Sequence, residues 1–336
     1  MIRIGVIGLG FMGRVHMQAW GRMPDAKIVA VSDQDPKRVA GDFSGTEGNL
    51  GDGGATKLSV EKPRGTTNWR ELLDATDIDV LDICTPTPTH TEIVLAALAA
   101  GKHVICEKPL APTSADAIKI ATAAKASKGF FMPAMCMRFW PQWQWLKQAM
   151  TEKRYGKVQA ATFRRVASLP GGWFRDGKLS GGAVLDLHIH DVDFIYHLFG
   201  LPRGIFSRGY VRDTGAVDHV SSQFVYDDVP LVHAEGGWVM ADGFGFNMFY
   251  TVNFERATAD FDIGRKDPLL LSQAGKKEPI DCGPEHGYVG EISYFADCVK
   301  SGKRPTVVTA DDAVAGIKMV EAEKRSIASG KIEKPE

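Results

Sequence analysis

The chain has 336 residues, of which 44% are hydrophobic and 24% charged, and its net charge at pH 7 is −1. This length predicts two domains, while the balanced charge and the lack of a membrane-length apolar run argue against nucleic acid and membrane partners. Five scattered cysteines without a CxxC pair, together with an N-terminus that lacks a signal-peptide pattern, predict a cytoplasmic protein with free thiols and no metal site.

The N-terminus combines a short apolar run with a glycine-rich turn. Residues 2–7 predict a buried strand, and residues 14–22 predict a helix. Of the three glycines between them, the first permits a tight bend, the second lets a pyrophosphate approach the backbone, and the third brings helix and strand together. The helix start attracts phosphates through its unpaired N–H groups. The residues expected to bind the cofactor here are Gly8, Gly10, Phe11, Met12 and Gly13.

A second apolar run, residues 27–33, ends in Asp33, 20 residues after Gly13. At this position a carboxylate accepts hydrogen bonds from an adenine ribose and repels a 2′-phosphate, so the sequence favours NAD over NADP. Lys37 and Arg38 lie close enough to soften that preference. The alternative for Asp33 is a helix cap or turn residue ahead of Pro36.

Further strands and helices alternate as far as residue 134. The segment Gly41–Gly65 contains seven glycines and predicts a mobile loop. Beyond it, buried strands at 78–84, 103–106 and 130–133 alternate with helices at 91–100 and 115–127. This order predicts a doubly wound parallel sheet, in which ligands bind at the carboxyl ends of the strands. Asp33, the loop Thr85–His90 and the segment Glu107–Pro109 all fall at those ends.

The pattern changes after residue 134. A helix to about residue 152 is followed by alternating apolar runs at 158–166, 204–211, 221–226, 231–239 and 244–254, which predict a mainly antiparallel sheet. Helices are expected at 183–199, 288–300 and 311–329. The predicted domains are therefore a Rossmann-type dinucleotide-binding domain, residues 1–134, and an α+β substrate-binding and oligomerisation domain, residues 135–336.

Two segments carry side chains suited to proton transfer. Lys108 lies between Glu107 and Pro109 at the end of a strand, where its ammonium can polarise a substrate oxygen; the alternative is a surface ion pair with Glu107. On the helix expected at 183–199, Asp186 and His190 are four residues apart and share one face. A carboxylate beside an imidazole tunes it for proton transfer near neutral pH. The alternative is a structural role for His190.

Taken together, these motifs resemble the glucose–fructose oxidoreductase/inositol dehydrogenase (Gfo/Idh/MocA) family. The matching residues extend over nearly the whole chain and are Gly8, Gly10, Gly13, Asp33, Thr85, Pro86, His90, Glu107, Lys108, Pro109, Gly181, Gly182, Asp186 and His190. The resemblance implies an NAD(P)-dependent oxidoreductase that transfers hydride between the nicotinamide and a secondary alcohol of a cyclic polyol, sugar or sugar derivative. It also implies a homodimer or homotetramer.

The same resemblance implies the roles of individual residues. Lys108 binds and polarises the reacting hydroxyl, Asp186 contacts the substrate and tunes the imidazole, and His190 is the general base. Thr85, Pro86, His90, Glu107 and Lys108 are implied at the cofactor. Arg138 and Trp173 are candidate substrate contacts, whereas the tryptophans at 140, 143 and 145 are expected to pack at an interface.

Three departures from the family pattern are Thr87, where many relatives carry Asn, His188, and the glycine-rich insertion at 41–65. Cys84 and Cys106 are expected near the cofactor as buried, inert thiols. Two other functions stay open on the same fold. One is a lyase or glycosidase that retains NAD, and the other is a sugar or NAD sensor without activity.

Overall fold

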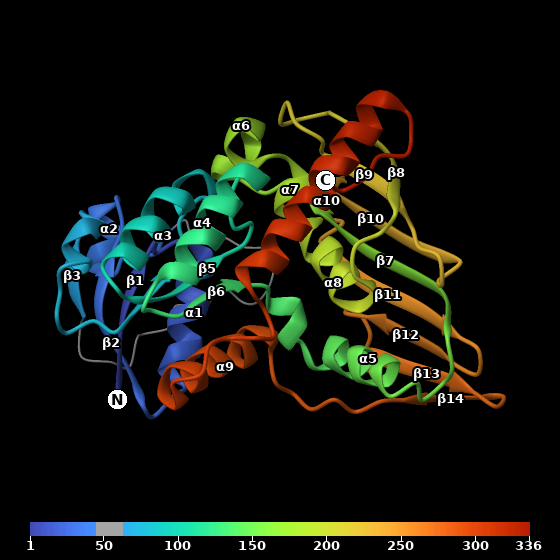
Figure 1. Ribbon diagram of the computed structural model, residues 1–336, viewed down its shortest axis with the longest axis horizontal. Coiled ribbons are helices and arrows are strands. Elements are labelled where there is room, and N and C mark those ends of the chain that lie inside the picture. Colours follow the sequence, from blue (N-terminus) through green and yellow to red (C-terminus); the bar gives the residue numbers. More distant parts are fainter. Residues whose placement is uncertain (45–62) are drawn as a thin grey trace. The chain divides into compact units, whose positions relative to one another are not determined.

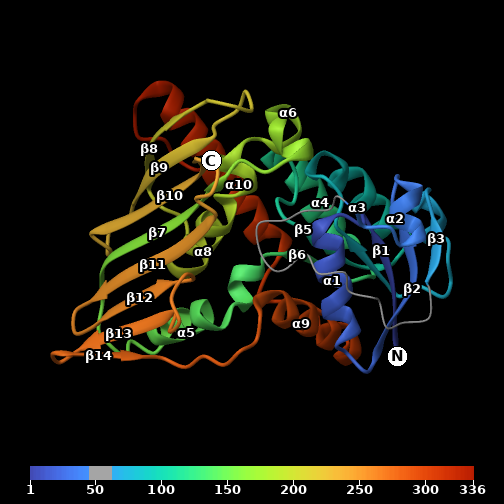
Figure 2. The same cartoon turned by 180° about the vertical axis from the view of Figure 1, so that it is seen from behind.

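The computed structural model describes residues 1–44 and 63–336. These residues divide into two compact units, each with its own sheet (Figures 1 and 2). The first unit consists of Met1–Cys136 and His286–Val314, and the second of Met137–Glu285 and Ala315–Glu336. Helix α9 (Gly287–Ser301), which the predicted boundary at residue 134 assigns to the second domain, packs on α1 (Phe11–Gly21) in the first unit.

The sheet of the first unit has six strands, all of them parallel. Their order is β3-β2-β1-β4-β5-β6, so the strand order reverses between β1 and β4, where doubly wound sheets bind dinucleotides. This confirms the predicted Rossmann-type sheet. The strands are β1 (Ile2–Ile7), β2 (Ala26–Ser32), β3 (Arg64–Thr66), β4 (Val80–Ile83), β5 (His103–Glu107) and β6 (Phe131–Ala134).

Helices cover both faces of this sheet: α3 and α4 face the viewer in Figure 1, and α1 faces the viewer in Figure 2. Apart from α1 and α9, the α-helices are α2 (Pro36–Ala40), α3 (His90–Ala99) and α4 (Ser114–Ala126), with short 3-10 turns at Trp69–Leu72 and Thr87–Thr89. Most of the predicted loop Gly41–Gly65 lies outside the described residues. At the end of this segment the loop prediction is wrong, because Arg64 and Gly65 belong to β3, which pairs with β2 at the edge of the sheet.

The second unit contains an eight-stranded sheet in the order β14-β13-β12-β11-β7-β10-β9-β8. Its pairs are antiparallel except that β7 and β10 are parallel, as the prediction of a mainly antiparallel sheet requires. Strands β12, β13 and β14 have no counterpart in the prediction. The strands are β7 (Val158–Ser168), β8 (Gly204–Tyr210), β9 (His219–Val225), β10 (Leu231–Met240), β11 (Phe246–Phe254), β12 (Thr258–Asp262), β13 (Leu269–Gln273) and β14 (Lys276–Pro279).

The helices of the second unit lie along one face of its sheet (Figures 1 and 2). In the described residues the opposite face carries no helix. Trp143, Phe163, Phe194 and Tyr250 fill the layer between helices and sheet with fully buried rings. The helices are α5 (Pro141–Thr151), α6 (Gly177–Ser180), α7 (Ala183–Asp186), α8 (Ile189–Phe199) and the second half of α10 (Ala310–Ser329), with a 3-10 turn at Gly172–Arg175.

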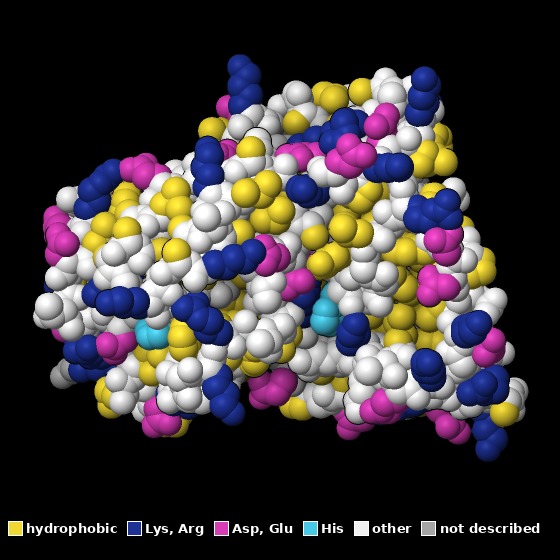
Figure 3. Space-filling model, in the orientation of Figure 1, with side chains coloured by type: hydrophobic (Ala, Val, Ile, Leu, Met, Phe, Trp, Pro, Cys, Tyr) yellow, Lys and Arg dark blue, Asp and Glu magenta, His cyan; other side chains and the backbone are white. Residues whose placement is uncertain are grey.

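Charges of both signs are interspersed on the face shown in Figure 3, in keeping with a net charge of −1. Within the described ranges, every helix is too short or too polar to cross a lipid bilayer.

Candidate active site

The three glycines of the N-terminal turn are needed for different reasons. Gly8 has a φ of +92°, and a Cβ there would lie 2.6 Å from the carbonyl oxygen of Cys84. A Cβ on Gly13 would lie 1.9 Å from the carbonyl oxygen of Gly8, so both glycines are required by close packing of the chain on itself. Gly10 differs, because no described atom lies within 4 Å of where its Cβ would be. Within the described residues, this position is therefore open on the side where a Cβ would point.

Helix α1 starts at Phe11, earlier than the predicted Arg14, because Gly10 serves as its N-cap residue and Phe11 and Met12 adopt helical backbone. Among the described residues no side chain caps this helix, and its first turn contains no acidic residue. The helix therefore presents unneutralised N–H groups and the positive end of its dipole beside the open space at Gly10. A pyrophosphate fits these requirements, and the residues present therefore suit a dinucleotide.

The carboxylate of Asp33 follows β2 at the same edge of the sheet. Its Oδ2 accepts a hydrogen bond from the Leu9 N–H at 2.7 Å, and its Oδ1 accepts one from the Asp35 N–H at 2.8 Å. Asp33 thus links the glycine turn to the start of α2, and the predicted turn role is present. The guanidinium of Arg38 lies 3.6 Å from Oδ2. A ribose contact by Asp33 stays a prediction.

The loop after β4 is tied to the loop after β5 by His90. This side chain is fully buried; its Nε2 lies 2.7 Å from the carbonyl oxygen of Thr85 and its Nδ1 lies 2.9 Å from that of Pro109. Burial lowers the pKa of His90 more than these two carbonyls raise it. His90 therefore holds the two loops together, and its predicted contact with the cofactor, like those of Thr85 and Pro86, stays a prediction.

Lys108 directly follows β5 and is half-buried. Its backbone N–H donates to Oε2 of the buried Glu107 at 2.9 Å. The next peptide bond, Lys108–Pro109, is cis. Lys108 is thus attached to the sheet edge on one side through Glu107 and on the other through the Pro109 carbonyl that His90 contacts.

Behind this edge lies a buried polar cluster that the sequence analysis missed. His16 of α1 places Nδ1 3.0 Å from both carboxylate oxygens of Asp82 and Nε2 3.0 Å from Oε1 of Glu107. The indole N–H of Trp20 also donates to Asp82 at 2.7 Å, and the fully buried Glu291 of α9 lies 3.9 Å from Nε2. The spacing of His16 from Gly13, one helical turn, is the signal that points to it.

Within the described residues, ligand-type atoms of His16, Asp82 and Cys84 lie within 4.8 Å of one another. The His16 ring and the Trp20 indole already occupy Asp82 with hydrogen bonds. Burial, and then the charge of Asp82, raise the pKa of the Cys84 thiol. Since metals bind the thiolate, this environment disfavours Cys84 as a ligand. Burial likewise raises the pKa of Cys106, in keeping with the expectation of inert thiols.

In the second unit, the predicted single helix over 183–199 is wrong. Helix α7 ends at Asp186 and α8 begins at Ile189, with Leu187 and His188 in a turn between them. The N–H groups of both Leu187 and His188 donate to the carbonyl oxygen of Ala183, so the chain widens here from α-helical to π-type bonding. Asp186 is buried and His190 half-buried. They therefore belong to different helices, and their predicted partnership stays a prediction.

His188, which departs from the family pattern, anchors this turn. Its ring is fully buried, and Nε2 lies 3.0 Å from Oε1 of the equally buried Glu323 on α10. A Cβ on Gly236 would lie 2.4 Å from its Nδ1, so β10 packs directly on the ring. Burial lowers the pKa of His188, but the charge and hydrogen bond of Glu323 together with the charge of Asp191 outweigh this effect and raise the pKa overall. His188 therefore fixes the turn between Asp186 and His190.

The predicted substrate contacts in the second unit differ in their surroundings. Arg138 is buried and holds Asp193 through hydrogen bonds of 2.9 and 2.7 Å. Trp173 is half-buried and stacks on Phe174 with ring centroids 4.3 Å apart. Trp143 lies in the core of this unit, whereas the prediction placed it at an interface. The guanidinium of Arg138 has a structural partner, whereas the indole of Trp173 retains exposed surface.

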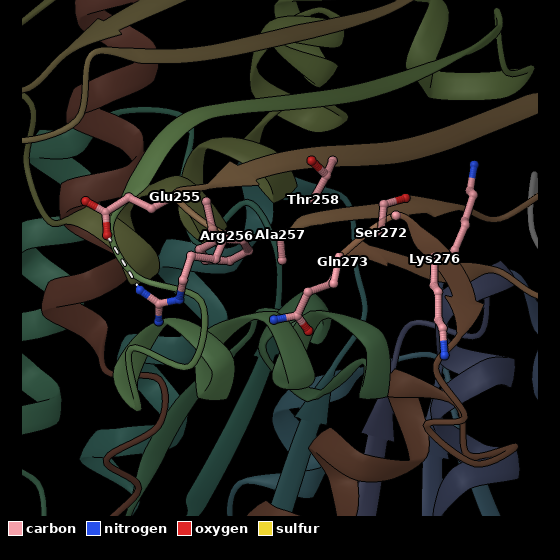
Figure 4. Close-up of a pocket in the computed structure, with 11 residues that line it drawn as sticks. Glu255, Arg256, Ala257, Thr258, Ser272, Gln273 and Lys276 are labelled. Carbon is pink, nitrogen blue, oxygen red and sulfur yellow. Dashed lines mark ion pairs between the residues drawn. The ribbon is translucent and has the colours of Figure 1, made fainter.

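A hollow of about 470 Å³ lies elsewhere in the second unit, between the β11–β12 and β13–β14 hairpin ends. Figure 4 shows Glu255 and Arg256 paired on one side of it and Lys276 on the other. Its lining includes no residue that the sequence analysis places at the substrate or cofactor.

Comparison with known proteins assigns both halves of the chain to one family. Residues 2–135 match the model of the Gfo/Idh/MocA oxidoreductase family, described as an NAD-binding Rossmann fold, and residues 143–260 match the family's C-terminal domain. The chain is 28% identical to myo-inositol 2-dehydrogenase of Thermotoga maritima, over 97% of this chain and 96% of that protein. It is 26% identical to inositol 2-dehydrogenase of Rhizobium meliloti, over 97% of each.

Among solved structures, levoglucosan dehydrogenase in complex with NADH and levoglucosan superposes with a TM-score of 0.86 at 21% identity, covering 99% of both chains. This likeness shows a shared fold. The chain therefore belongs to the Gfo/Idh/MocA family and is an oxidoreductase with an NAD-binding Rossmann domain.

Proposed function

We propose that this protein is an NAD-dependent dehydrogenase that oxidises a secondary alcohol of a cyclic polyol, sugar or sugar derivative. The inositol dehydrogenases similar to it over nearly their whole length support this substrate class, as does the fold it shares with levoglucosan dehydrogenase.

The observation that carries the proposal is the gathering of four segments at one edge of the parallel sheet. The glycine turn follows β1, Asp33 follows β2, the Thr85 loop follows β4, and Lys108 follows β5. A hydrogen bond to Asp33 connects the glycine turn with the end of β2, and the ring of His90 contacts carbonyl oxygens of both of the last two loops. A side-chain ammonium at this edge lies where ligands of doubly wound sheets bind.

The residues of this edge suit NAD. Gly10 and the first turn of α1 hold the pyrophosphate, and Asp33 binds the adenosine ribose and disfavours a 2′-phosphate. When bound, NAD supplies a nicotinamide carbon that accepts hydride.

The roles of the protein's own groups follow from their chemistry. The ammonium of Lys108 donates a hydrogen bond to the reacting hydroxyl oxygen and stabilises the negative charge that develops on it. The imidazole of His190 takes the hydroxyl proton, and Asp186 orients that imidazole. The aromatic face of Trp173 packs on the C–H surface of the sugar ring.

The proposal is tested with a panel of cyclic polyols, aldoses and sugar acids, each incubated with NAD or NADP while NADH or NADPH absorbance is recorded. We expect stoichiometric NADH with at least one cyclic polyol or sugar. Product formation while NAD stays bound and no NADH accumulates would instead identify a lyase or glycosidase. NADH or sugar binding without any product identifies a sensor.

The base is tested on the substrate so identified. We expect His190→Asn to lower kcat at least about 100-fold, the usual scale of general base catalysis, and to remove the acid limb of the pH profile. His233→Asn, in the same unit and hydrogen-bonded to Ser221, is the matched control and keeps wild-type kcat. Equal kcat for both variants contradicts the role of His190.

A further inference from the structure

The His16 ring is held between two carboxylates in the interior of the first unit. Both oxygens of Asp82 lie 3.0 Å from Nδ1, and Oε1 of Glu107 lies 3.0 Å from Nε2. His16 and Asp82 are fully buried, and Glu107 is 5% exposed. In so dry an environment these contacts are scarcely screened by water. The contact of Nδ1 with Asp82 has hydrogen-bond geometry, whereas Nε2 lies at ion-pair distance from Glu107 without a hydrogen bond.

The carboxylate of Glu107 contacts both His16 and the backbone of Lys108. One of its carboxylate oxygens faces His16, and the other accepts the backbone N–H of Lys108 at 2.9 Å. A planar carboxylate cannot move one oxygen without the other. The position of the His16 ring therefore fixes the point at which the chain of Lys108 leaves β5.

The groups around the ring support a charged His16. Burial lowers its pKa, but the charge of Asp82 and the hydrogen bonds with Asp82 and Cys84 outweigh this effect and raise the pKa well above its usual value. Burial raises the pKa of the neighbouring Glu291 carboxyl, aided by Glu107 and Asp82 and opposed by His16. Glu291 therefore holds its proton more tightly than an ordinary glutamate, and the His16 ring lies between the carboxyl groups of Asp82 and Glu107.

Burying such a cluster costs desolvation free energy, and apolar residues of the same volume commonly stabilise a core better than a buried ion pair. Stability alone therefore does not account for the cluster. Its location offers another reason. The cluster connects α1, which begins at the glycine turn, with the residue that precedes Lys108. We propose that His16 is a positioning residue for the dehydrogenase reaction, which holds Lys108 in place through Glu107.

This inference rests on the proposed function of Lys108, and the experiment separates the two. His16→Asn keeps an amide near Asp82 but is too short to reach Glu107, whereas His16→Gln reaches Glu107. We expect His16→Asn to lower kcat at saturating NAD and sugar about tenfold or more, because displacements of about 1 Å cost this much or more. We expect His16→Gln to have a kcat close to that of the wild type. In both variants the Kd for NADH should stay within about threefold of the wild-type value.

The decisive measurement is a double-mutant cycle with Lys108→Ala. If His16 acts through Lys108, the variant His16→Asn/Lys108→Ala has the kcat of Lys108→Ala alone. His103→Asn, at the opposite end of β5 and hydrogen-bonded to the Phe130 N–H, is the matched control with wild-type kcat. If His16→Asn does not fold, as judged by its melting temperature, Glu107→Gln takes its place in the cycle.

If the fold losses in kcat of the two single variants multiply in the double variant, the positioning role is wrong. The same holds if the Kd for NADH rises as much as kcat falls. Both results leave the proposed function intact. A Lys108→Ala variant with wild-type kcat overturns the assigned function of Lys108 and the positioning role together.

Discussion

Gly10 and Gly13 lie in the same turn, yet only one of them is required by the packing of the chain. Gly13 has no room for a Cβ because the carbonyl oxygen of Gly8 lies 1.9 Å from its position. Gly10 has an ordinary φ of −71° and open space. The sequence predicted different roles for these two glycines, and the structure bears out the packing role of Gly13, while the ligand role of Gly10 stays a prediction.

This difference makes Gly10→Ala a probe of cofactor binding. We predict that the variant folds with a melting temperature close to that of the wild type and binds NADH at least about tenfold more weakly, because its methyl group occupies the space of the pyrophosphate. Isothermal titration measures the affinity. Gly21→Ala, at the other end of α1 and equally open, is the control. Unchanged NADH affinity in Gly10→Ala contradicts the assigned binding site.

A second prediction concerns the buried Glu291. Its pKa in the folded protein lies well above the ordinary value of 4.5, so folding takes up a proton and the stability due to this group is lost as the pH rises between those two values. Glu291→Gln removes this proton uptake. We predict that the unfolding free energy of the variant relative to the wild type increases by about 1.4 kcal/mol per pH unit in this range.

Urea denaturation of both proteins at several pH values from 5 upward measures this difference. Parallel pH dependences would mean that Glu291 ionises normally in the folded state. His16, whose folded pKa is also raised, adds a decline in stability above pH 6.5 that both proteins share.

At the scale of elements, periodic apolar runs predicted the parallel sheet almost completely. β1, β4 and β5 were found because they are continuous and apolar. β12 and β14 were missed because they carry Asp260, Asp262, Lys276 and Lys277 in strands of low intrinsic propensity. The break between α7 and α8 was missed because Leu187 and His188 are compatible with a helix, and only the buried partner of His188 reveals the turn.

A further prediction concerns the choice between NAD and NADP and the role of Asp33, which follows β2. Asp33→Asn keeps an acceptor for the Leu9 N–H but removes the negative charge, and Arg38 lies 3.6 Å away to meet a 2′-phosphate. We predict that the ratio of kcat/KM for NAD to that for NADP falls about tenfold or more. Steady-state kinetics with both cofactors measures it. Asp35→Asn, which alters the cap of α2 and a 3.9 Å contact with Arg38, is the control for the loss of a nearby charge and changes the ratio less. An unchanged ratio in Asp33→Asn is the contradicting result.

At the scale of the whole molecule, residues far apart in the chain build the first unit. An amphipathic helix such as α9 does not show from its sequence which sheet it covers, and it brings Glu291 to His16. The spacing of His16 from Gly13 was a local signal for this residue, but its contact with Glu291 could not be predicted because the two residues are far apart in the sequence. The family and its cofactor domain were predictable because their motifs are local. The substrate and the residues that select it depend on tertiary structure.

The most direct test of the proposed reaction is the kcat of Lys108→Ala for NADH formation from the sugar or polyol found in the panel. We predict a loss of at least about 100-fold with an unchanged Kd for NADH, since the ammonium acts on the substrate oxygen and not on the dinucleotide. Lys119→Ala, an exposed lysine of α4 paired with Asp116, keeps wild-type kcat. A Lys108→Ala enzyme that forms NADH as fast as the wild type would contradict the proposed chemistry.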